Sequence, residues 1–167
     1  MDGSLVDAFR EQAAERGIET TLVDRDGASE AIRDAIEFPA VGSPLLTLDV
    51  SLPEPVITDP SADQLESART GITAATVGVT SEGAIVIEES PAKEGPVSLF
   101  PPRQIAALRT EDLVADVPDL FELLGESFAD GRDDAVVVAG PSATSDMGEL
   151  VTGVHGPETV HVILVEP

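Results

Sequence analysis

The sequence contains no cysteine, no tryptophan and no tyrosine. Without cysteine the chain can form no disulfide, and it offers no thiolate to zinc, to an iron–sulfur cluster or to covalent catalysis. Aromatic residues make up only 3% of the 167 residues, whereas hydrophobic residues make up 42%. We therefore expect a core of Val, Ile, Leu and Ala, and the length fits a single domain over residues 1–167.

Positive charge is also scarce. Nine Lys and Arg residues stand against 32 Asp and Glu residues, which gives a net charge of -23, and Lys93 is the single lysine. Such a chain repels phosphates, so we expect no nucleic-acid partner. The acids are spread along the sequence, which favours solvation in concentrated salt over binding of a basic partner. This composition resembles that of proteins from salt-accumulating halophiles.

Long hydrophobic runs are absent as well. No apolar stretch approaches the roughly 20 residues that are needed to span a bilayer. Residues 1–7 lack the basic start and the apolar core of a signal peptide. We therefore expect no membrane insertion and a cytoplasmic location, with which the lack of cysteine is compatible.

The spacing of apolar residues predicts an α/β domain. Two helices flank a short strand in residues 4–37, a pattern typical of a parallel sheet on which both helices pack. A polar turn at 81–83 between two β-like runs predicts an antiparallel hairpin. The apolar run at 135–139 predicts a strand that is buried on both faces. The predicted helices cover residues 4–16, 26–37, 61–68, 116–128 and 144–150, and the predicted strands cover 19–23, 45–48, 73–79, 84–88, 97–100, 103–109, 135–139 and 160–165.

A polar turn after the predicted strand at 135–139 is the first candidate site. Gly140, Pro141, Ser142 and Thr144 precede a predicted helix, whose free N–H groups could bind an anion together with the two hydroxyls. The alternative is that Ser142 or Thr144 only caps the helix. Asp146 could accept a proton or orient a ligand, or it could complement the helix dipole.

A second turn carries one of the two histidines. His155 lies between Gly153 and Gly156, where a histidine can act as acid, base or ligand, or can bond local carbonyls. We expect Ser142, Asp146 and His155 to line a shared hollow. His161 alternates with valines and is expected in the core, and no metal site is expected. In the hairpin, Gly78 and Glu82 could reach the site if the hairpin folds over the sheet edge.

Several catalytic motifs are missing. The sequence has no phosphate-loop lysine motif, no dinucleotide glycine fingerprint and no Gly-x-Ser-x-Gly elbow. Because these motifs are missing, the sequence lends no support to serine hydrolase chemistry.

The two turns and the last strand resemble a known family. The strings GPSATSDM at 140–147, GVHGP at 153–157 and HVILV at 161–165 resemble the closing signature of the LUD-domain family. GVTSEGA at 78–84 and SLFPPRQIA at 98–106 match more loosely, so that the resemblance covers residues 71–167. It implies a three-layer α/β fold with a mostly parallel sheet and a β-hairpin, similar to the sugar-phosphate isomerase and CoA-transferase group.

The resemblance also implies a function. It suggests a non-redox component of a lactate-oxidising system that binds a small ligand or partner subunits, namely an iron–sulfur protein and an oxidoreductase. Any clusters would belong to those partners, and this chain would hold no cofactor. The alternative is a stand-alone enzyme of the cyclo-ligase, isomerase or acyl/CoA-transferase type. The chain departs from the family at three positions: Ala143 replaces the family's usual arginine, Glu82 a threonine, and Gln104 a frequent histidine. The lost arginine and the acid gained in the hairpin both make the pocket less suited to an anion.

Overall fold

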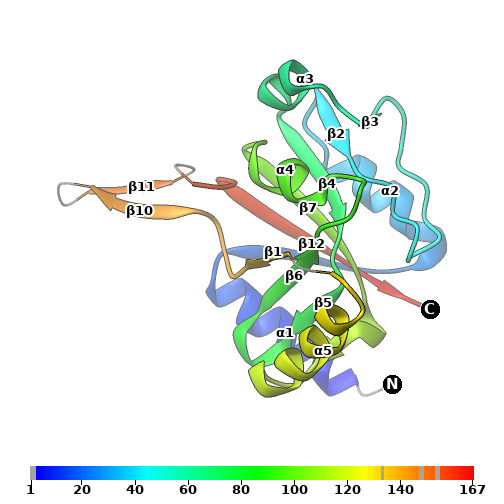
Figure 1. The fold of residues 1–167 in the computed structure, drawn as a ribbon, viewed down its shortest axis with the longest axis vertical. Coiled ribbons are helices and arrows are strands. Elements are labelled where there is room, and N and C mark those ends of the chain that lie inside the picture. The colour runs from blue at the N-terminus through cyan, green and yellow to red at the C-terminus, as the bar shows by residue number, and fades with distance from the viewer. Residues whose placement is uncertain (1–2, 133, 147–148, 153–154) are drawn as a thin grey trace.

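Six parallel strands form the central sheet of the computed structural model (Figure 1). The structure describes residues 3–132, 134–146, 149–152 and 155–167, and for 144–146 and 149–152 it describes the backbone alone. Every neighbouring pair in this sheet is parallel. The order is β1 (Ile18–Asp24), β12 (Thr159–Glu166), β7 (Arg103–Arg109), β4 (Thr70–Ala74), β2 (Ala40–Gly42) and β3 (Ile57–Thr58).

Helices cover both faces of this sheet. On one face, α2 (Arg25–Ala35) buries Ala28 and Ile32 against residues of β7 and β12 such as Ile105 and Ile163. On the other face, α1 (Gly3–Glu15) buries Phe9 and Ala13 against Val162 and Leu164. Successive side chains of β12 therefore point to opposite faces of the sheet and are buried under α1 on one face and under α2 on the other, as expected for a central parallel strand.

Two short helices complete the end of the sheet where β4 begins. The helix α3 (Ala62–Ser67) starts at a capping box, in which Ser61 and Gln64 bond each other's backbone N–H groups. The helix α4 (Glu94–Leu99) lies against β4 so closely that a Cβ on Gly71 would be 1.9 Å from the Val97 carbonyl oxygen. Glycine at position 71 thus permits the helix and the strand to touch.

A second, four-stranded sheet packs on the same face as α1. Its order is β8 (Leu113–Val114), β5 (Val77–Val79), β6 (Ala84–Glu88) and β9 (Ala135–Val138). Short 3-10 turns, η1 (Thr80–Glu82) and η2 (Thr110–Asp112), lead into β6 and β8. The helix α5 (Val117–Ala129) covers its outer side through Leu120.

The chain passes between the two sheets within two residues. The Ala75 N–H donates to the Ala107 carbonyl of β7 at 2.8 Å, and the next N–H, that of Thr76, donates to the Val86 carbonyl of β6 at 2.8 Å. The expected strand over 73–79 is therefore wrong as a single element, because its two halves belong to different sheets.

The α/β class with a mostly parallel sheet is confirmed, and so is the antiparallel hairpin, formed by β5 and β6. Two expected elements have the wrong type. Residues 97–100 fall largely in α4. The periodicity of so short an apolar run does not distinguish a helix from a strand, and the packing of this segment on Gly71 determines that it is helical. The described residues of the expected helix at 144–150 lie in strands: β10 (Ala143–Asp146) and β11 (Glu149–Thr152) pair as an antiparallel arm that extends from the body (Figure 1).

Three further expectations fail in part. The strand at 135–139 is an edge strand, and its Val137 is 57% exposed, so it is not buried on both faces. Residues 45–48 form a turn that is closed by a Leu45–Val50 bridge. On α5, Leu120 is buried as expected, but Phe121 and Phe128 are exposed, because the helix packs through a narrow stripe.

Candidate ligand-binding cleft

The described surface has a cleft where β4 and β7 end. A hollow of about 540 Å³ and a neighbouring one of about 190 Å³ share Thr47, Thr76, Glu88 and Arg132. The crossing at Ala75 and Thr76 places β4's end in the cleft wall. Ligands of open α/β sheets bind beyond the carboxyl ends of the parallel strands, so the fold places this cleft where a site is expected.

Glu88 is the central polar residue of the cleft. Its carboxylate accepts hydrogen bonds from the Ser127 hydroxyl on α5 and from Arg132 Nη1, the latter at 2.6 Å. The Glu88 side chain is only 8% exposed, whereas that of Arg132 is 59% exposed. A buried carboxylate is thus fixed from two sides, while the guanidinium beside it remains open to solvent and to a ligand.

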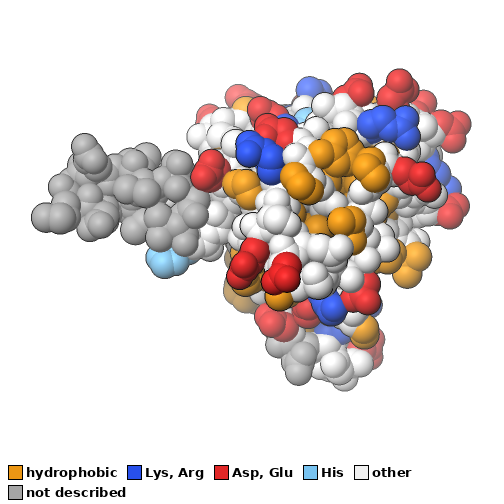
Figure 2. All heavy atoms as spheres, turned by 90° about the horizontal axis from the view of Figure 1, so that it is seen from above, with side chains coloured by type: hydrophobic (Ala, Val, Ile, Leu, Met, Phe, Trp, Pro, Cys, Tyr) orange, Lys and Arg blue, Asp and Glu red, His pale blue; other side chains and the backbone are white. Residues whose placement is uncertain are grey.

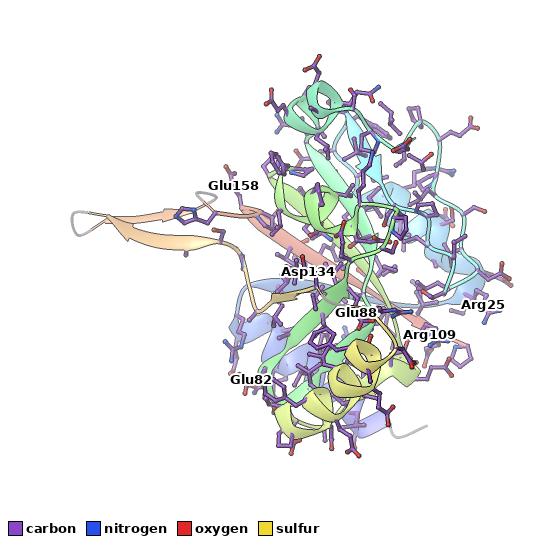
Figure 3. The ribbon with its side chains drawn as sticks, viewed as in Figure 1. Arg25, Glu82, Glu88, Arg109, Asp134 and Glu158 are labelled. Atoms are coloured by element: carbon purple, nitrogen blue, oxygen red, sulfur yellow. The ribbon has the colours of Figure 1, made fainter. Side chains whose placement is uncertain are left out.

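Arg109 supplies the second guanidinium of the cleft. Its Nε and Nη2 bond the two Asp112 carboxylate oxygens at 2.6 and 2.8 Å, and Nη1 lies 2.9 Å from Glu111 Oε1. The hydrogen bond to Asp112 is the main cause that raises the pKa of Arg109. Figure 3 shows Arg109 and Glu88 near the middle of the molecule, with Glu82 well away from both.

The lining combines this polar network with an apolar wall. Ala75, Val77, Leu123 and Leu124 line the larger hollow, and the hydroxyls of Thr76 and Ser127 lie among them. A small molecule with one polar end and an apolar body matches such a lining. In the described part of the chain, no group of three His, Cys, Asp or Glu side chains is placed to hold a metal ion.

Ser142 and His155, two of the turn residues expected to form the site, are not in the lining of this cleft. Ser142 and His155 do meet: the His155 backbone N–H donates to Ser142 Oγ at 3.2 Å, and the Ser142 N–H donates to the Pro157 carbonyl at 2.8 Å. Gly156 lies against Ser142, since a Cβ there would be 3.4 Å from Ser142 Cβ. The hydroxyl therefore holds two turns together at the base of the arm.

The anion site expected at a helix start is wrong in its structural premise, because the segment after Gly140 enters β10 and no helix begins there. In the ladder of the arm, Thr144 faces Val151 and Asp146 faces Glu149. Their side chains, and all of Gly153, lie outside the described residues. Whether Asp146 shares a hollow with Ser142 and His155 therefore stays a prediction.

The hairpin residues occupy structural positions. Gly78 is in the core, where a Cβ would come within 2.6 Å of both Leu108 and Leu113. Glu82 pairs with Arg16 of the α1 segment at 2.6 Å. Gly140 approaches the same segment, because its Cβ would lie 2.9 Å from the Arg16 carbonyl oxygen, and Pro141 packs near Gly17. These contacts join the second sheet and the start of the arm to the end of α1.

Gln104 and Glu82, two of the three residues that differ from the LUD-domain pattern, have local contacts that explain them. Gln104 is fully buried, and its Nε2 donates to Thr73 Oγ1 at 2.8 Å and to the Ile105 carbonyl at 3.2 Å. Glu82 has its ion pair with Arg16. Ala143 opens β10 at the base of the arm.

Sequence reasoning missed the cleft residues Glu88, Ser127, Arg132 and Arg109. One available signal was the position of Arg109 at the end of a predicted strand in a chain with only nine cations. Nothing in the spacing of Glu88, Ser127 and Arg132 indicates that they meet. Their contact depends on α5 folding back over β6.

Comparison with known proteins assigns the family. The model of the LUD domain matches residues 55–165, which include the arm and the cleft residues Glu88, Arg109, Ser127 and Arg132. The chain belongs to the LUD domain family. A crystal structure of a DUF162 family protein from Deinococcus radiodurans has the same fold, with a TM-score of 0.70 over 98% of this chain and 97% of that one, at 23% identity.

Relatives of this LUD-domain chain carry a common name. A lactate utilization protein C from Bacillus licheniformis is 29% identical over 97% of this chain and 69% of its own length. Another, from Deinococcus radiodurans, is 33% identical over 75% of this chain and 59% of its own length. This chain therefore spans roughly two thirds of these relatives. None of the described helices is both long and apolar enough to cross a membrane.

Proposed function

We propose that this LUD-domain protein is a non-redox component of a lactate-utilization system. The observation that carries the proposal is the similarity to several proteins named lactate utilization protein C over most of this chain. Oxidation of lactate releases two electrons, and a chain without cysteine offers no thiolate to a cluster that could receive them. Iron–sulfur and oxidoreductase partners would therefore carry the electrons.

The cleft beyond β4 and β7 is the binding site within this proposal. Glu88 and Arg132 offer an acceptor and an open donor beside an apolar wall, which suits a small polar metabolite. Ser127 fixes the carboxylate from α5, so ligand binding would also couple α5 to the sheet.

Growth on lactate tests the proposal. Deletion of the gene in its host should abolish growth on lactate as sole carbon source, while growth on an unrelated carbon source continues. Wild-type protein should restore growth, and the isosteric variant Glu88→Gln should not. Glu82→Gln is the matched control, because it breaks another glutamate–arginine pair that lies away from the cleft.

The two parts of the proposal fail separately. Normal growth of the deletion strain on lactate would refute the role in lactate utilization. Full complementation by Glu88→Gln, at equal protein level, would refute the cleft as the site. Affinity purification at molar salt should recover a partner with acid-labile sulfide, and recovery of this chain alone would refute the association with an iron–sulfur protein.

A further inference from the structure

A second hollow lies on the opposite face of the parallel sheet. It measures about 610 Å³ and lies between α2 and the sheet, with Thr21 and Val23 of β1, Arg103 of β7 and His161 of β12 in its lining. Along each strand these residues alternate with residues that point to the other face, and the strand register aligns them, so their side chains all lie on the α2 face of the sheet. The groove is separate from the cleft that contains Glu88 and Arg109, because none of its lining residues lines that cleft.

Three polar side chains form a row in this groove. Thr21 Oγ1 lies 2.8 Å from His161 Nε2, and His161 Nδ1 lies 3.5 Å from Glu19 Oε2. The strand register places Glu19 directly opposite His161. The groups therefore follow one another in the order hydroxyl, imidazole Nε2, imidazole Nδ1, carboxylate. Hydrolases that use an activated hydroxyl nucleophile have their catalytic groups in the same order.

The surroundings of His161 favour the neutral ring. Its side chain is 14% exposed, and Nδ1 is buried with no hydrogen-bond partner among the described residues. Burial, chiefly, lowers the pKa of His161, with Arg103 acting in the same direction and Glu19 against it. With the proton on Nδ1, facing Glu19, the Nε2 lone pair accepts the hydrogen bond that the Thr21 hydroxyl donates.

We propose that Thr21, His161 and Glu19 are the nucleophile, the general base and the positioning carboxylate of an esterase site in this groove. Thr21 Oγ attacks the ester carbonyl carbon as its proton moves to His161 Nε2. The C–O bond to the leaving alcohol then breaks, and the alcohol takes that proton. Water, deprotonated by His161, attacks the acyl–threonine ester and releases the carboxylic acid and the free hydroxyl.

Arg103 is the cation in the lining of this groove. Its Nε donates to the Ala35 carbonyl at 2.8 Å and thereby orients the guanidinium, whereas its contacts to Glu19 and Thr159 are both 3.5 Å long. A guanidinium held in this way stabilises the oxyanion of a tetrahedral intermediate.

The charges around the groove define the substrate class. Glu19 is 64% exposed, and Glu30 and Asp34 of α2 add two exposed acids to the lining. Anionic acyl groups and acyl-CoA would be repelled by these carboxylates. The site fits a small carboxylic ester whose acyl group is uncharged or cationic.

Hydrolysis of p-nitrophenyl acetate by the full chain tests this site. The wild type should exceed the buffer rate, and Thr21→Val or His161→Gln should lower the enzymatic rate by at least about 100-fold. Thr21→Ser should retain activity, because it keeps the hydroxyl. His155→Gln is the matched control, since it removes the other histidine and should leave the rate unchanged.

Glu19 needs a measurement that a structural role would not change. Glu19→Gln should move the acidic limb of the pH–rate profile to lower pH, because His161 then keeps Arg103 as a neighbour and loses its facing carboxylate. Glu19→Asp should restore the wild-type limb. An unchanged limb in Glu19→Gln would contradict the positioning role.

A covalent label keeps the proposal testable if a variant fails to fold. A fluorophosphonate probe should modify wild-type Thr21, as located by peptide mass spectrometry. Wild-type hydrolysis at the buffer rate, Thr21→Val with wild-type activity, or a label confined to other residues would each overturn the proposal.

Discussion

Substitution of Gly71 by alanine should destabilise the protein strongly although it adds a single methyl group. The new Cβ would lie 1.9 Å from the Val97 carbonyl oxygen and 3.1 Å from Pro101 Cγ, and real Cβ atoms essentially never come closer than 3.0 Å to such atoms. Gly71 does not have a positive φ, so the effect is steric. Relief requires α4 to move away from β4.

The magnitude follows from the cost of overpacking. Extra methylene groups in a packed core cost about 1–3 kcal/mol, and a clash with backbone on a neighbouring helix belongs at the upper end of that range. In a domain of this size each kcal/mol corresponds to a Tm change of roughly 2–4 °C. We therefore expect Gly71→Ala to lower Tm by about 6–12 °C.

Gly125→Ala is the matched control. A Cβ on Gly125 meets nothing within 4 Å, and the residue is exposed in α5, also without a positive φ. Alanine is favoured over glycine in a helix by about 0.8–1 kcal/mol, so this variant should raise Tm. Thermal unfolding followed by circular dichroism at fixed salt measures both. Gly71→Ala at or above the wild-type Tm would refute the close contact between α4 and β4.

Three further predictions concern charge and capping. Raising KCl from 0.1 to 1 M shortens the Debye length from about 10 to 3 Å and should raise Tm, because the net charge of -23 repels itself; a Tm independent of salt would contradict this. The acidic side chains are spread over the face seen in Figure 2, so screening should act across the surface. The pKa of His161 is lowered in the folded state from its ordinary 6.5, so the free energy of unfolding should fall as pH drops from about 6.5 towards the folded-state pKa, and His161→Gln should remove that slope in urea titrations. Ser61→Ala removes one half of the capping box at α3 and should cost about 1 kcal/mol in the same titrations, whereas an unchanged midpoint would show that α3 contributes nothing to the transition.

Parts of the fold could be predicted because local chemistry decides them. The strand at 103–109 agrees with the structure, and the helices expected at 61–68 and 116–128 agree with it to within one residue at each end. The failures share one cause: short segments with weak patterns take their structure from what they touch. Residues 97–100 are helical where they meet Gly71, and the strand at 135–138 lies at a sheet edge because it pairs with β6 alone.

The candidate cleft could not be predicted from the sequence, because its residues are brought together only by tertiary contacts. Glu88 and Arg132 are 44 residues apart, and their 2.6 Å contact exists because α5 and β9 return the chain to β6. Ser142 and His155, which the turn chemistry did single out, lie together at the base of the arm.

The sequence by itself determined the α/β class, the aliphatic core, the lack of thiolate chemistry and the acidic surface, since each depends on composition or on local periodicity. The tertiary structure alone decided which polar groups meet: Glu88 with Arg132 and Ser127 in the cleft, and Thr21 with His161 in the groove. Such contacts join strands and helices far apart in the chain, and no local propensity encodes which strand becomes the neighbour of which.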